Sequence, residues 1–367
     1  MHSVSTPRKV DGWLLACTFL LLAIGVLMVF STTAVTSQEA SGDSATMIRH
    51  HFVHIVLGFF ALAACLSFQP QMLYKAAIPC LVTALFMLCI TLIPGIGYVA
   101  GGARRWLVFG PLRVQPGEIA KLCAIVYFAS YIDRHREEMS SFRSGVAIPF
   151  AILGMFAVML LLEPDFGSTV IILTVVFCQL FLFCRVRHML AVGMFAAFGL
   201  VVLIVSSPYR LKRLITFMDP FEDPTSSGYQ LIQSLIAVGS GGLSGTGLGA
   251  GRQKLFYLPA AHTDFIFAVI AEELGILGAV FVLGIFLVIL YRGLQITRRL
   301  IDRPYLACLS LGCTLLIVIP ALLNMGVVLG MLPTKGMVLP LVAYGGTAMV
   351  VHLAVVGILL RLSRTEV

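Results

Sequence analysis

Charged residues are scarce in this chain of 367 residues. Asp, Glu, Lys and Arg make up 11% of it and hydrophobic residues 59%, whereas a soluble domain carries about 25% charged residues. Apolar stretches of about 17–25 residues recur along the whole length, enough to cross a hydrocarbon core of roughly 30 Å. They are too long for barrel strands, and only helices and closed barrels satisfy their backbone in lipid. The composition therefore predicts an all-α polytopic membrane protein whose core is the helix bundle itself.

Motifs of soluble metal and nucleotide sites are also lacking. The nine cysteines lie in or at the ends of apolar segments and form no C-x-x-C pair, so we interpret them as small core residues. There is no G-x-x-x-x-G-K-[ST] sequence, and the relaxed nucleotide-type match "GTGLGA" is not set between a strand and a helix. The net charge of +8 fits basic cytoplasmic loops and does not indicate nucleic acid.

Hydropathy predicts about ten transmembrane helices in a single membrane domain, 1–367. No small-residue cleavage site follows the first apolar run, so it is predicted to be a retained span. Lys and Arg favour the inner side when both termini are cytoplasmic. A large outer loop, 207–264, then joins spans seven and eight. The predicted spans lie near 13–33, 50–68, 76–93, 116–133, 145–162, 168–184, 189–206, 265–290, 305–325 and 343–361.

Basic residues on the outer side form two clusters. One holds Arg104, Arg105 and Arg113, and the other runs from Arg210 to Lys254. The positive-inside rule works against outer cations, so an anionic ligand at the outer face is the simplest explanation. The alternative is that long loops cross the membrane regardless of charge.

Two outer segments are predicted to have unusual backbones. In the long loop, the spacing of Tyr229, Ile232 and Ile236 predicts an amphipathic helix. The glycine run 239–251 that follows permits sharp turns, whose N–H groups could hold phosphate oxygens. The segment 331–349 contains two prolines and three glycines and carries the cation Lys335 at its tip, so we expect an irregular segment that lines protein or a water-filled cavity.

Acidic residues stand at the outer edges of several spans. Glu118 follows Pro116 in the first turn of the fourth span, and Lys121 lies three residues later on the same face. The pair is either a helix cap with its counter-ion or part of a functional cavity, because ionisable groups at membrane depth usually face one. Asp165 is placed to cap the helix that follows Pro164.

Asp264, in "HTDF", has two readings that the sequence leaves open. A partly desolvated carboxylate has a raised pKa, which suits a general base, but the residue could also cap the eighth span. Glu272 and Glu273, further into that span, are the least explained, and we expect them to be buried against the bundle cavity.

These features separate two classes of function. A transporter would place acids deep in its spans, with a site at mid-membrane. An enzyme acting on a lipid-borne anionic substrate would gather its polar groups at one face. Under the ten-span topology, the acids and cations named above map to the outer side, which favours the enzyme.

Six stretches, taken together and in order, resemble the FtsW/RodA/SpoVE (SEDS) family over nearly the whole chain. The "LPTKG" stretch is more similar to the division or sporulation branch than to the elongation branch, and the absence of any other sporulation cue places the division branch first. The stretches are "GGARRWL" (101–107), "QPGEIAK" (115–121), "EPDFGS" (163–168), "GYQLIQSLIAVGSGGLSGTG" (228–247), "HTDFIFAVIAEELG" (262–275) and "LPTKGMVLPLVAYGG" (332–346).

The resemblance implies a ten-span peptidoglycan glycosyltransferase in the bacterial inner membrane. Such an enzyme polymerises lipid II at the outer face, at the division septum, beside an FtsI-like class B penicillin-binding transpeptidase and other divisome membrane proteins. A lipid II flippase and an elongation-type (RodA-like) polymerase are the alternatives. The expected reaction is inverting: the acceptor 4-hydroxyl attacks the donor's anomeric carbon, and undecaprenyl pyrophosphate leaves.

The resemblance also assigns roles to residues. Asp264 is the expected general base, and Glu118 and Lys121 are expected catalytic residues that line the central cavity. A divalent cation, Mg²⁺ or Mn²⁺, is expected to help neutralise the pyrophosphate, with ligands that the sequence does not identify. The expected substrate-binding residues are Arg104, Arg105, Asp165, Arg210, His262 and Lys335.

Three positions depart from the family pattern. The family often has an acid where this chain has Ala260 or Ala261, so a second loop acid is not expected. Gly117 and Ala343 stand where serine is common, and the first change removes a potential capping hydroxyl. None of these changes removes a residue assigned to the chemistry.

Overall fold

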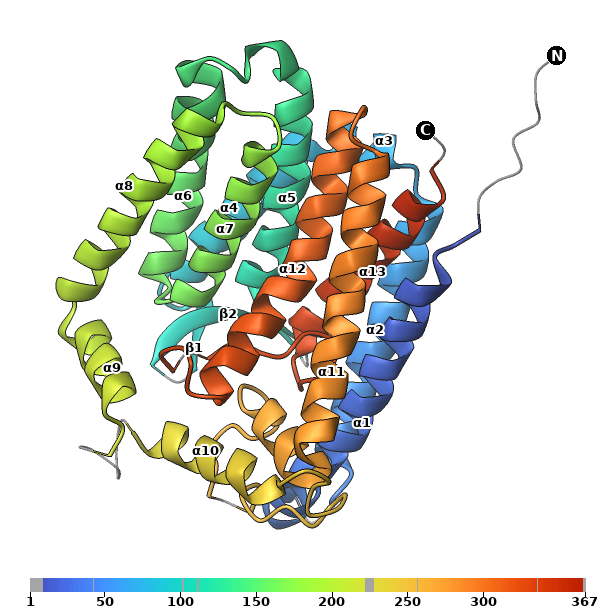
Figure 1. The fold of residues 1–367 in the computed structure, drawn as a ribbon, viewed down its shortest axis with the longest axis vertical. Coiled ribbons are helices and arrows are strands. Elements are labelled where there is room, and N and C mark those ends of the chain that lie inside the picture. The colour runs from blue at the N-terminus through green and yellow to red at the C-terminus, as the bar shows by residue number, and fades with distance from the viewer. Residues whose placement is uncertain are drawn as a thin grey trace.

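A computed structural model shows a bundle of long helices standing side by side (Figure 1). It describes residues 9–41, 43–100, 102–110, 112–221, 228–255, 257–334 and 336–365. The helices are α1 (Gly12–Ser41), α2 (Thr46–Ser67), α3 (Pro70–Lys75), α4 (Ala77–Leu92), α5 (Pro116–Arg134), α6 (Ile148–Leu162), α7 (Phe166–Phe181), α8 (Val186–Val205), α9 (Pro208–Met218), α10 (Tyr229–Gly241), α11 (Ile266–Arg299), α12 (Pro304–Val328) and α13 (Gly346–Ser363), with short helical turns η1 (Arg136–Glu138) and η2 (Arg143–Ala147) before α6.

Each of the ten predicted spans overlaps one helix of the bundle. Among the described residues, six helical segments are long and apolar enough to cross a membrane, so the chain is a multi-pass membrane protein. They comprise α1, α2, η2 with α6, α11, α12 and α13. Shorter apolar helices occur at α4, α7 and α8. Crossings by these three and by α5, which carries charged residues, stay predictions.

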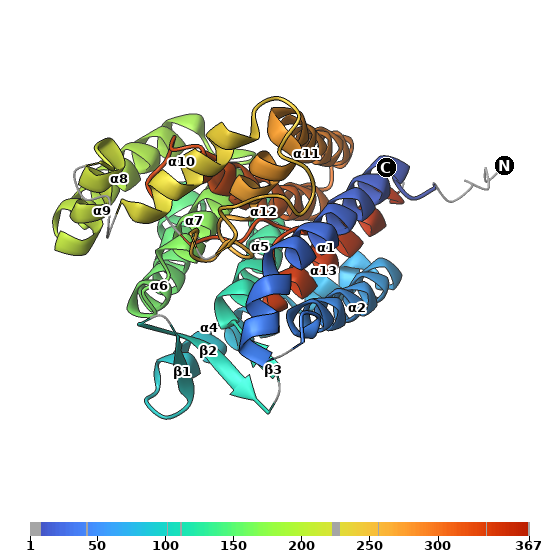
Figure 2. The same cartoon turned by 90° about the horizontal axis from the view of Figure 1, so that it is seen from below.

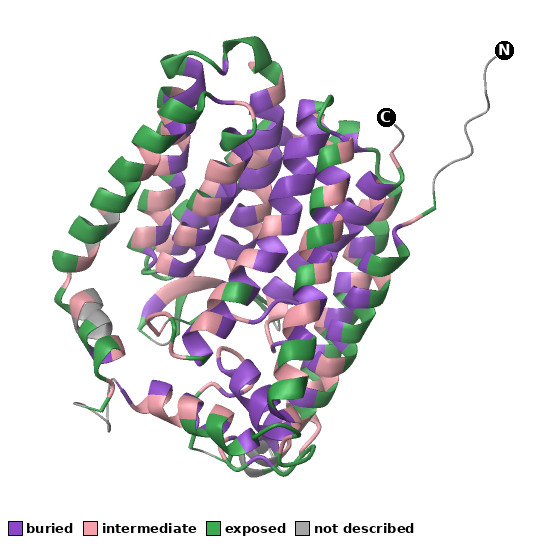
Figure 3. Ribbon diagram, viewed as in Figure 1, coloured by how far each residue is buried: buried purple, intermediate pink, exposed green. Residues whose placement is uncertain are grey.

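The most buried helices stand at the centre of the bundle (Figure 3). In the apolar 18-residue stretches of α12 and α13, 78% and 83% of the residues are buried inside the protein. By contrast, α8 lies at the edge and exposes large apolar side chains such as Phe195 and Phe198. A hydrocarbon surround removes the usual penalty for exposed apolar surface, so this outer helix fits a membrane environment.

A small antiparallel sheet between α4 and α5 was not predicted from the sequence. Its strands are β1 (Gly97–Ala100), β2 (Ala103–Phe109) and β3 (Leu112–Val114), in the order β1-β2-β3. The register shifts between Tyr98 and Val99. The sheet lies at one end of the bundle and projects to one side (Figures 1 and 2). It carries Arg104 and Arg105 in β2, where successive side chains point to opposite faces.

The long outer loop contains two helices, α9 and α10, which run from α8 across the end of the bundle towards α11 (Figure 1). The helix predicted from Tyr229 to Ile236 is confirmed as part of α10. The loop then enters α11, which is interrupted at Gly275 by a backbone φ of 69°. Between α12 and α13, the described residues form neither helix nor strand, as the prolines and glycines predicted.

At the opposite end of the bundle, an ion pair joins the start of α1 to α11. Arg292 Nε donates a hydrogen bond of 2.9 Å to Asp11 Oδ2. Asp11 Oδ1 also accepts hydrogen bonds of 3.1 Å from the backbone N–H groups of Trp13 and Leu14, so it caps the first turn of α1.

We expect Asp11→Ala to lower the free energy of unfolding by about 1–2 kcal/mol, because it removes a helix cap and the partner of Arg292. The matched control is Arg49→Ala, which breaks the exposed pair between Arg49 and Asp43 and should change stability by less than about 0.5 kcal/mol. Thermal unfolding of the purified variants in detergent measures both. Equal melting temperatures for the two variants would contradict the assignment.

Candidate functional site

Five segments meet at the end of the bundle that carries the sheet. They are β2, the start of α5, the turn between α6 and α7, the loop that precedes α11, and the irregular segment 329–345. Under the predicted topology, this end faces outward. The candidate site is built from the polar side chains of these segments.

Asp264 occupies a short turned segment held by backbone bonds. Ala260 adopts a positive φ of 57°, and its carbonyl accepts hydrogen bonds from the N–H groups of Thr263 and Phe265 at 3.1 and 3.3 Å. The N-cap of α11 is Phe265, and no side chain caps that helix. The capping reading of Asp264 is therefore wrong, and its carboxylate is left for another role.

Asn324 of α12 fixes the backbone around Asp264. Its side-chain amide donates hydrogen bonds of 2.7 Å to the carbonyl of Asp264 and 2.6 Å to that of Met337. The N–H of Tyr344 adds a third link, of 3.0 Å, to the carbonyl of His262. Together these bonds join the irregular segment to the loop that carries Asp264. The sequence reading missed Asn324, for which the only signal was a lone amide in an apolar span.

The carboxylate of Asp264 is partly buried and accepts no hydrogen bond from the residues that the structure describes. It lies against Gly336, where an added Cβ would come within 2.8 Å of Oδ2. Burial raises the pKa of Asp264 to about 6, while the positive charge of Arg105 acts in the opposite direction. An unbonded carboxylate with this pKa suits a general base near neutral pH.

Arg105 and Arg104 differ in what they contact. The Nε of Arg105 donates a 3.1 Å hydrogen bond to the carbonyl of Glu163, and its guanidinium also bonds the carbonyl of Pro164. Arg104 instead donates a 3.0 Å hydrogen bond to the carbonyl of Leu92 at the end of α4. Arg105 thus acts on the site that contains Asp264, whereas the described contact of Arg104 is with a helix end.

Glu163 is a buried acid to which the sequence analysis gave no role. It is 1% exposed, and its Oε1 has no hydrogen-bond partner among the described residues. Burial, followed by the charge of Asp165, raises the pKa of Glu163 to about 8, and Arg105 opposes this. At neutral pH it is therefore largely protonated and able to donate a hydrogen bond. Its position just before a proline turn between two spans was the available signal.

Asp165 caps α7, as predicted. Its carboxylate accepts hydrogen bonds from Ser168, 3.1 Å from the backbone N–H and 2.8 Å from the hydroxyl. It also lies beside the start of α5, because an added Cβ on Gly117 would come within 3.3 Å of Oδ2. The capping role accounts for its contacts within the protein, and substrate binding by Asp165 stays a prediction.

The predicted ion pair between Glu118 and Lys121 is present, with 2.8 Å between Lys121 Nζ and Glu118 Oε1. The two residues are 5% and 4% exposed, and Glu118 Oε2 has no hydrogen-bond partner in the part of the chain that the structure describes. His352 of α13, buried and within electrostatic reach of both, was missed by the sequence analysis. A lone histidine in an apolar helix was its only signal.

His262 stacks edge-on against Tyr344, with ring centroids 5.8 Å apart. Burial lowers the pKa of its imidazole, so the ring is neutral at pH 7. It orients the loop through its backbone carbonyl and this ring contact. The predicted substrate-binding residue Lys335 lies outside the described residues, and so does the side chain of Arg210 in α9.

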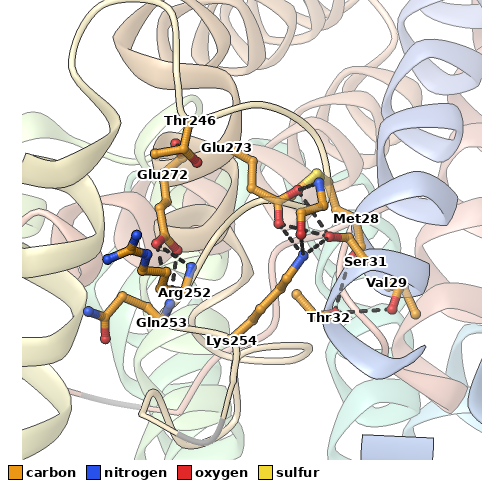
Figure 4. A network of polar contacts seen from close by, with 11 residues as sticks. Met28, Val29, Ser31, Thr32, Thr246, Arg252, Gln253, Lys254, Glu272 and Glu273 are labelled. Atoms are coloured by element: carbon orange, nitrogen blue, oxygen red, sulfur yellow. Dashed lines mark hydrogen bonds and ion pairs between the residues drawn. The ribbon is translucent and has the colours of Figure 1, made fainter. Parts of the chain in front are cut away.

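Several backbone amides in and just after the glycine run bond to the protein itself. The N–H groups of Gly249, Arg252 and Gln253 donate to the carboxylates of Glu273 and Glu272 (Figure 4). For these amides the phosphate-binding prediction is therefore wrong. The two glutamates are buried against the segment 242–254, called the glycine loop below, rather than against the bundle cavity.

The described residues contain no group of three or more His, Cys, Asp or Glu side chains that could hold a metal ion. The acids of the site lie on α5, in the turn between α6 and α7, and in the loop before α11. Arg105 lies within electrostatic reach of two of them, Glu163 and Asp264. The protein side chains alone therefore do not form a metal cage in this part of the chain.

Comparison with known proteins places this geometry in a family. Residues 12–367 match the model of the FtsW/RodA/SpoVE family, described as "Cell cycle protein". A protein of Alkalilimnicola ehrlichii is 42% identical over 353 residues, covering 95% of this chain and 88% of that protein. One of Legionella pneumophila is 42% identical over 363 residues, covering 98% and 92%. Both are named "Probable peptidoglycan glycosyltransferase FtsW".

Two solved structures share the fold. One, described as "Structural coordination of polymerization and crosslinking by a peptidoglycan synthase complex", is 30% identical, with a TM-score of 0.76, and the match covers 97% of this chain and 98% of that chain. The other is the rod shape determining protein RodA of Thermus thermophilus, 27% identical, with a TM-score of 0.70 and 97% coverage of both chains. With a family match over residues 12–367 and relatives of this similarity, the chain belongs to the FtsW/RodA/SpoVE family.

Proposed function

We propose that this protein is a peptidoglycan glycosyltransferase that polymerises lipid II into glycan strands at the outer face of the bacterial inner membrane, in septal wall synthesis. The observation that carries the proposal is the carboxylate of Asp264, which is free of described hydrogen bonds and lies within electrostatic reach of Arg105. The names of the relatives support the same reaction and the division process.

In the proposed reaction, Asp264 accepts the proton of the acceptor's 4-hydroxyl as that oxygen attacks the anomeric carbon of the donor. A carbon–oxygen bond forms on one face of the sugar, and the bond to the pyrophosphate breaks on the other, so the configuration inverts. The electron pair of the broken bond leaves with undecaprenyl pyrophosphate. The proton then passes from Asp264 to solvent. Asn324 holds the backbone of Asp264 in place during this transfer.

The leaving pyrophosphate needs positive charge nearby, because its negative charge grows as the bond breaks. Among the described cations, Arg105 is the one whose charge acts on Asp264. Lys121, buried beside Glu118, supplies a second positive charge. Arg104, Arg210 and Lys335 stay candidates for substrate contacts. The expected divalent cation also stays a proposal, and none of the steps above depends on it.

The arrangement favours an enzyme over a lipid II flippase. The described acids and cations of the site belong to β2, the start of α5, the turn between α6 and α7 and the loop before α11, which meet at one end of the bundle (Figure 1). A transporter with a mid-membrane site would have placed them within its spans. Exposed apolar side chains on α8 and other outer helices provide a lipid-facing surface for the undecaprenyl tails. An FtsI-like class B penicillin-binding partner is supported by the solved relative, which belongs to a peptidoglycan synthase complex. Other divisome membrane proteins stay expected partners.

We expect Asp264→Asn to abolish polymerisation of lipid II by the purified protein with its transpeptidase partner, because an amide cannot accept the hydroxyl proton. Melting temperature should be unchanged within a few degrees, since the side chain makes no described hydrogen bond. The control is Asp219→Asn, an exposed acid of the same outer loop, which should keep full activity. Full activity of Asp264→Asn would refute the base assignment. Lipid II transfer across liposomes without polymer would support the flippase.

The turnover rate should rise with pH through about 6, because Asp264 must lose its proton before it can act as base, and burial sets its pKa there. Arg105 holds this pKa down, so Arg105→Gln should move the acidic midpoint to higher pH as well as lower the plateau. Initial rates from pH 4.5 to 8.5 measure the effect. An unchanged midpoint in Arg105→Gln would mean that its charge does not act on the base.

The double variant Glu118→Gln, Lys121→Met should fold but turn over at least about tenfold more slowly, if the lysine charge stabilises the leaving group. Single replacement of Lys121 leaves a buried carboxylate unpaired and costs stability by itself, which is why the double variant is the informative one. Turnover per folded molecule and melting temperature are measured together. Parental turnover in a folded double variant would make the pair purely structural.

A further inference from the structure

The first part of α11 is a separate short helix that begins beside Asp264. Residues 266–274 are helical, and Gly275 then breaks the helix with a φ of 69° and a ψ of −170°. Nine residues of helix are about 14 Å long. A change of angle at Gly275 therefore moves the other end of the short helix, beside Asp264, through an arm of that length. The contacts that fix this angle therefore matter to the position of Asp264.

The glycine loop fills the break in α11. Loop amides donate to the carbonyls of the last two glutamates before the break, and loop carbonyls accept from amides just after it. These backbone bonds are Thr246 N–H to Glu272 O (3.0 Å), Gly247 N–H to Glu273 O (3.1 Å), Ile276 N–H to Gly242 O (3.0 Å) and Leu277 N–H to Leu243 O (3.2 Å). The loop thus replaces hydrogen bonds that an unbroken helix would have made for itself.

The approach is so close that side chains are excluded. An added Cβ on Gly245 would lie 2.1 Å from the carbonyl oxygen of Glu273. One on Gly251 would lie 2.9 Å from a carboxylate oxygen of Glu272 and 3.0 Å from one of Glu273. The glycines at these positions therefore allow the loop to pack directly against the end of the short helix.

Ser31, Lys254 and Glu273 form a buried cluster that ties this assembly to α1 (Figure 4). Lys254 Nζ lies 2.6 Å from Glu273 Oε1, 2.7 Å from Ser31 Oγ and 2.8 Å from the carbonyl of Gly249. These contacts use the three protons of the ammonium group. Ser31 in turn donates to the carboxylate of Glu273 at 2.8 Å. The glycine loop and the short helix are thereby joined to α1, which lies far from both in the sequence.

Stability alone does not explain the charges in this cluster. A buried ion pair is often no more stabilising than well-packed apolar residues of similar volume, but it demands a defined geometry. The bonds converge on Glu273, one residue before the end of the short helix. We propose that Lys254 and Glu273 are positioning residues for Asp264, with Ser31 as the third member of the cluster, so that the outer end of α1 and the glycine loop set the placement of the general base.

This inference rests on the proposed function, and two measurements distinguish a failure of the inference from a failure of the proposed function. The first is amide hydrogen exchange of 260–265, which reports the placement of the base whether or not polymer is made. We expect Glu273→Gln and the double variant Lys254→Met, Glu273→Gln to speed exchange of the Phe265 and Thr263 amides at least about tenfold, because the short helix loses its anchor. Unchanged exchange in both variants would overturn the proposal.

The second readout is steady-state polymerisation. A displaced base lowers kcat by about tenfold or more with little change in KM for lipid II, since misplacement by about 1 Å can cost a hundredfold. The acidic midpoint should also rise, because Asp264 moves relative to Arg105. A merely structural cluster would lower the amount of folded protein and leave kcat per folded molecule and the midpoint unchanged, which would overturn the proposal.

The matched control is Arg292→Met, which breaks the partly buried ion pair with Asp11 at the far end of the bundle. It should lower the melting temperature without changing exchange of 260–265, kcat or the midpoint. If the parent protein makes no polymer, the proposed function fails, and the exchange comparison still decides whether the cluster positions Asp264. If Arg292→Met changes exchange of 260–265 as much as Glu273→Gln does, the effect is general loosening and the positioning role is wrong.

Discussion

Backbone hydrogen bonding in a water-poor setting is the constraint on which the outer end of this protein depends. In lipid, a helix that stops or bends leaves amides and carbonyls that water cannot reach. At Gly275 the bend frees such groups, and the glycine loop supplies partners on both sides of it. The irregular segment before α13 meets the same demand through Asn324 and Tyr344. Asp264 lies between these two segments, the glycine loop and the irregular segment before α13.

The charge of Arg105 acts on two acids of the site, Glu163 and Asp264. Arg105 bonds two carbonyls of the α6–α7 turn, which leaves its position fixed and its charge available. Burial raises the pKa of Glu163 more than that of Asp264, to about 8 against about 6. The two carboxyl groups are thus set to differ in protonation near neutral pH, one as a hydrogen-bond donor and the other as a proton acceptor.

Local patterns predicted what local physics determines. Hydropathy located a helix at each predicted span, an i, i+3 spacing predicted the pair of Glu118 and Lys121, and the residue after Pro164 was correctly placed as a cap. Contacts between distant segments could not be read this way. The pairing of Glu272 with Arg252 and Gln253, or of Asn324 with two carbonyls, depends on how helices and loops pack. The sheet escaped prediction because its strands are short and surrounded by glycines.

The sheet has a consequence for how this chain tolerates changes in length. Arg104 and Arg105 are neighbours in β2, so one turns to the end of α4 and the other to the turn between α6 and α7. A slip of one residue in strand pairing would exchange their faces and send the wrong guanidinium to each place. Both arginines would still be present in the sequence. A single inserted or deleted residue in this hairpin can therefore be more damaging than replacement of either arginine.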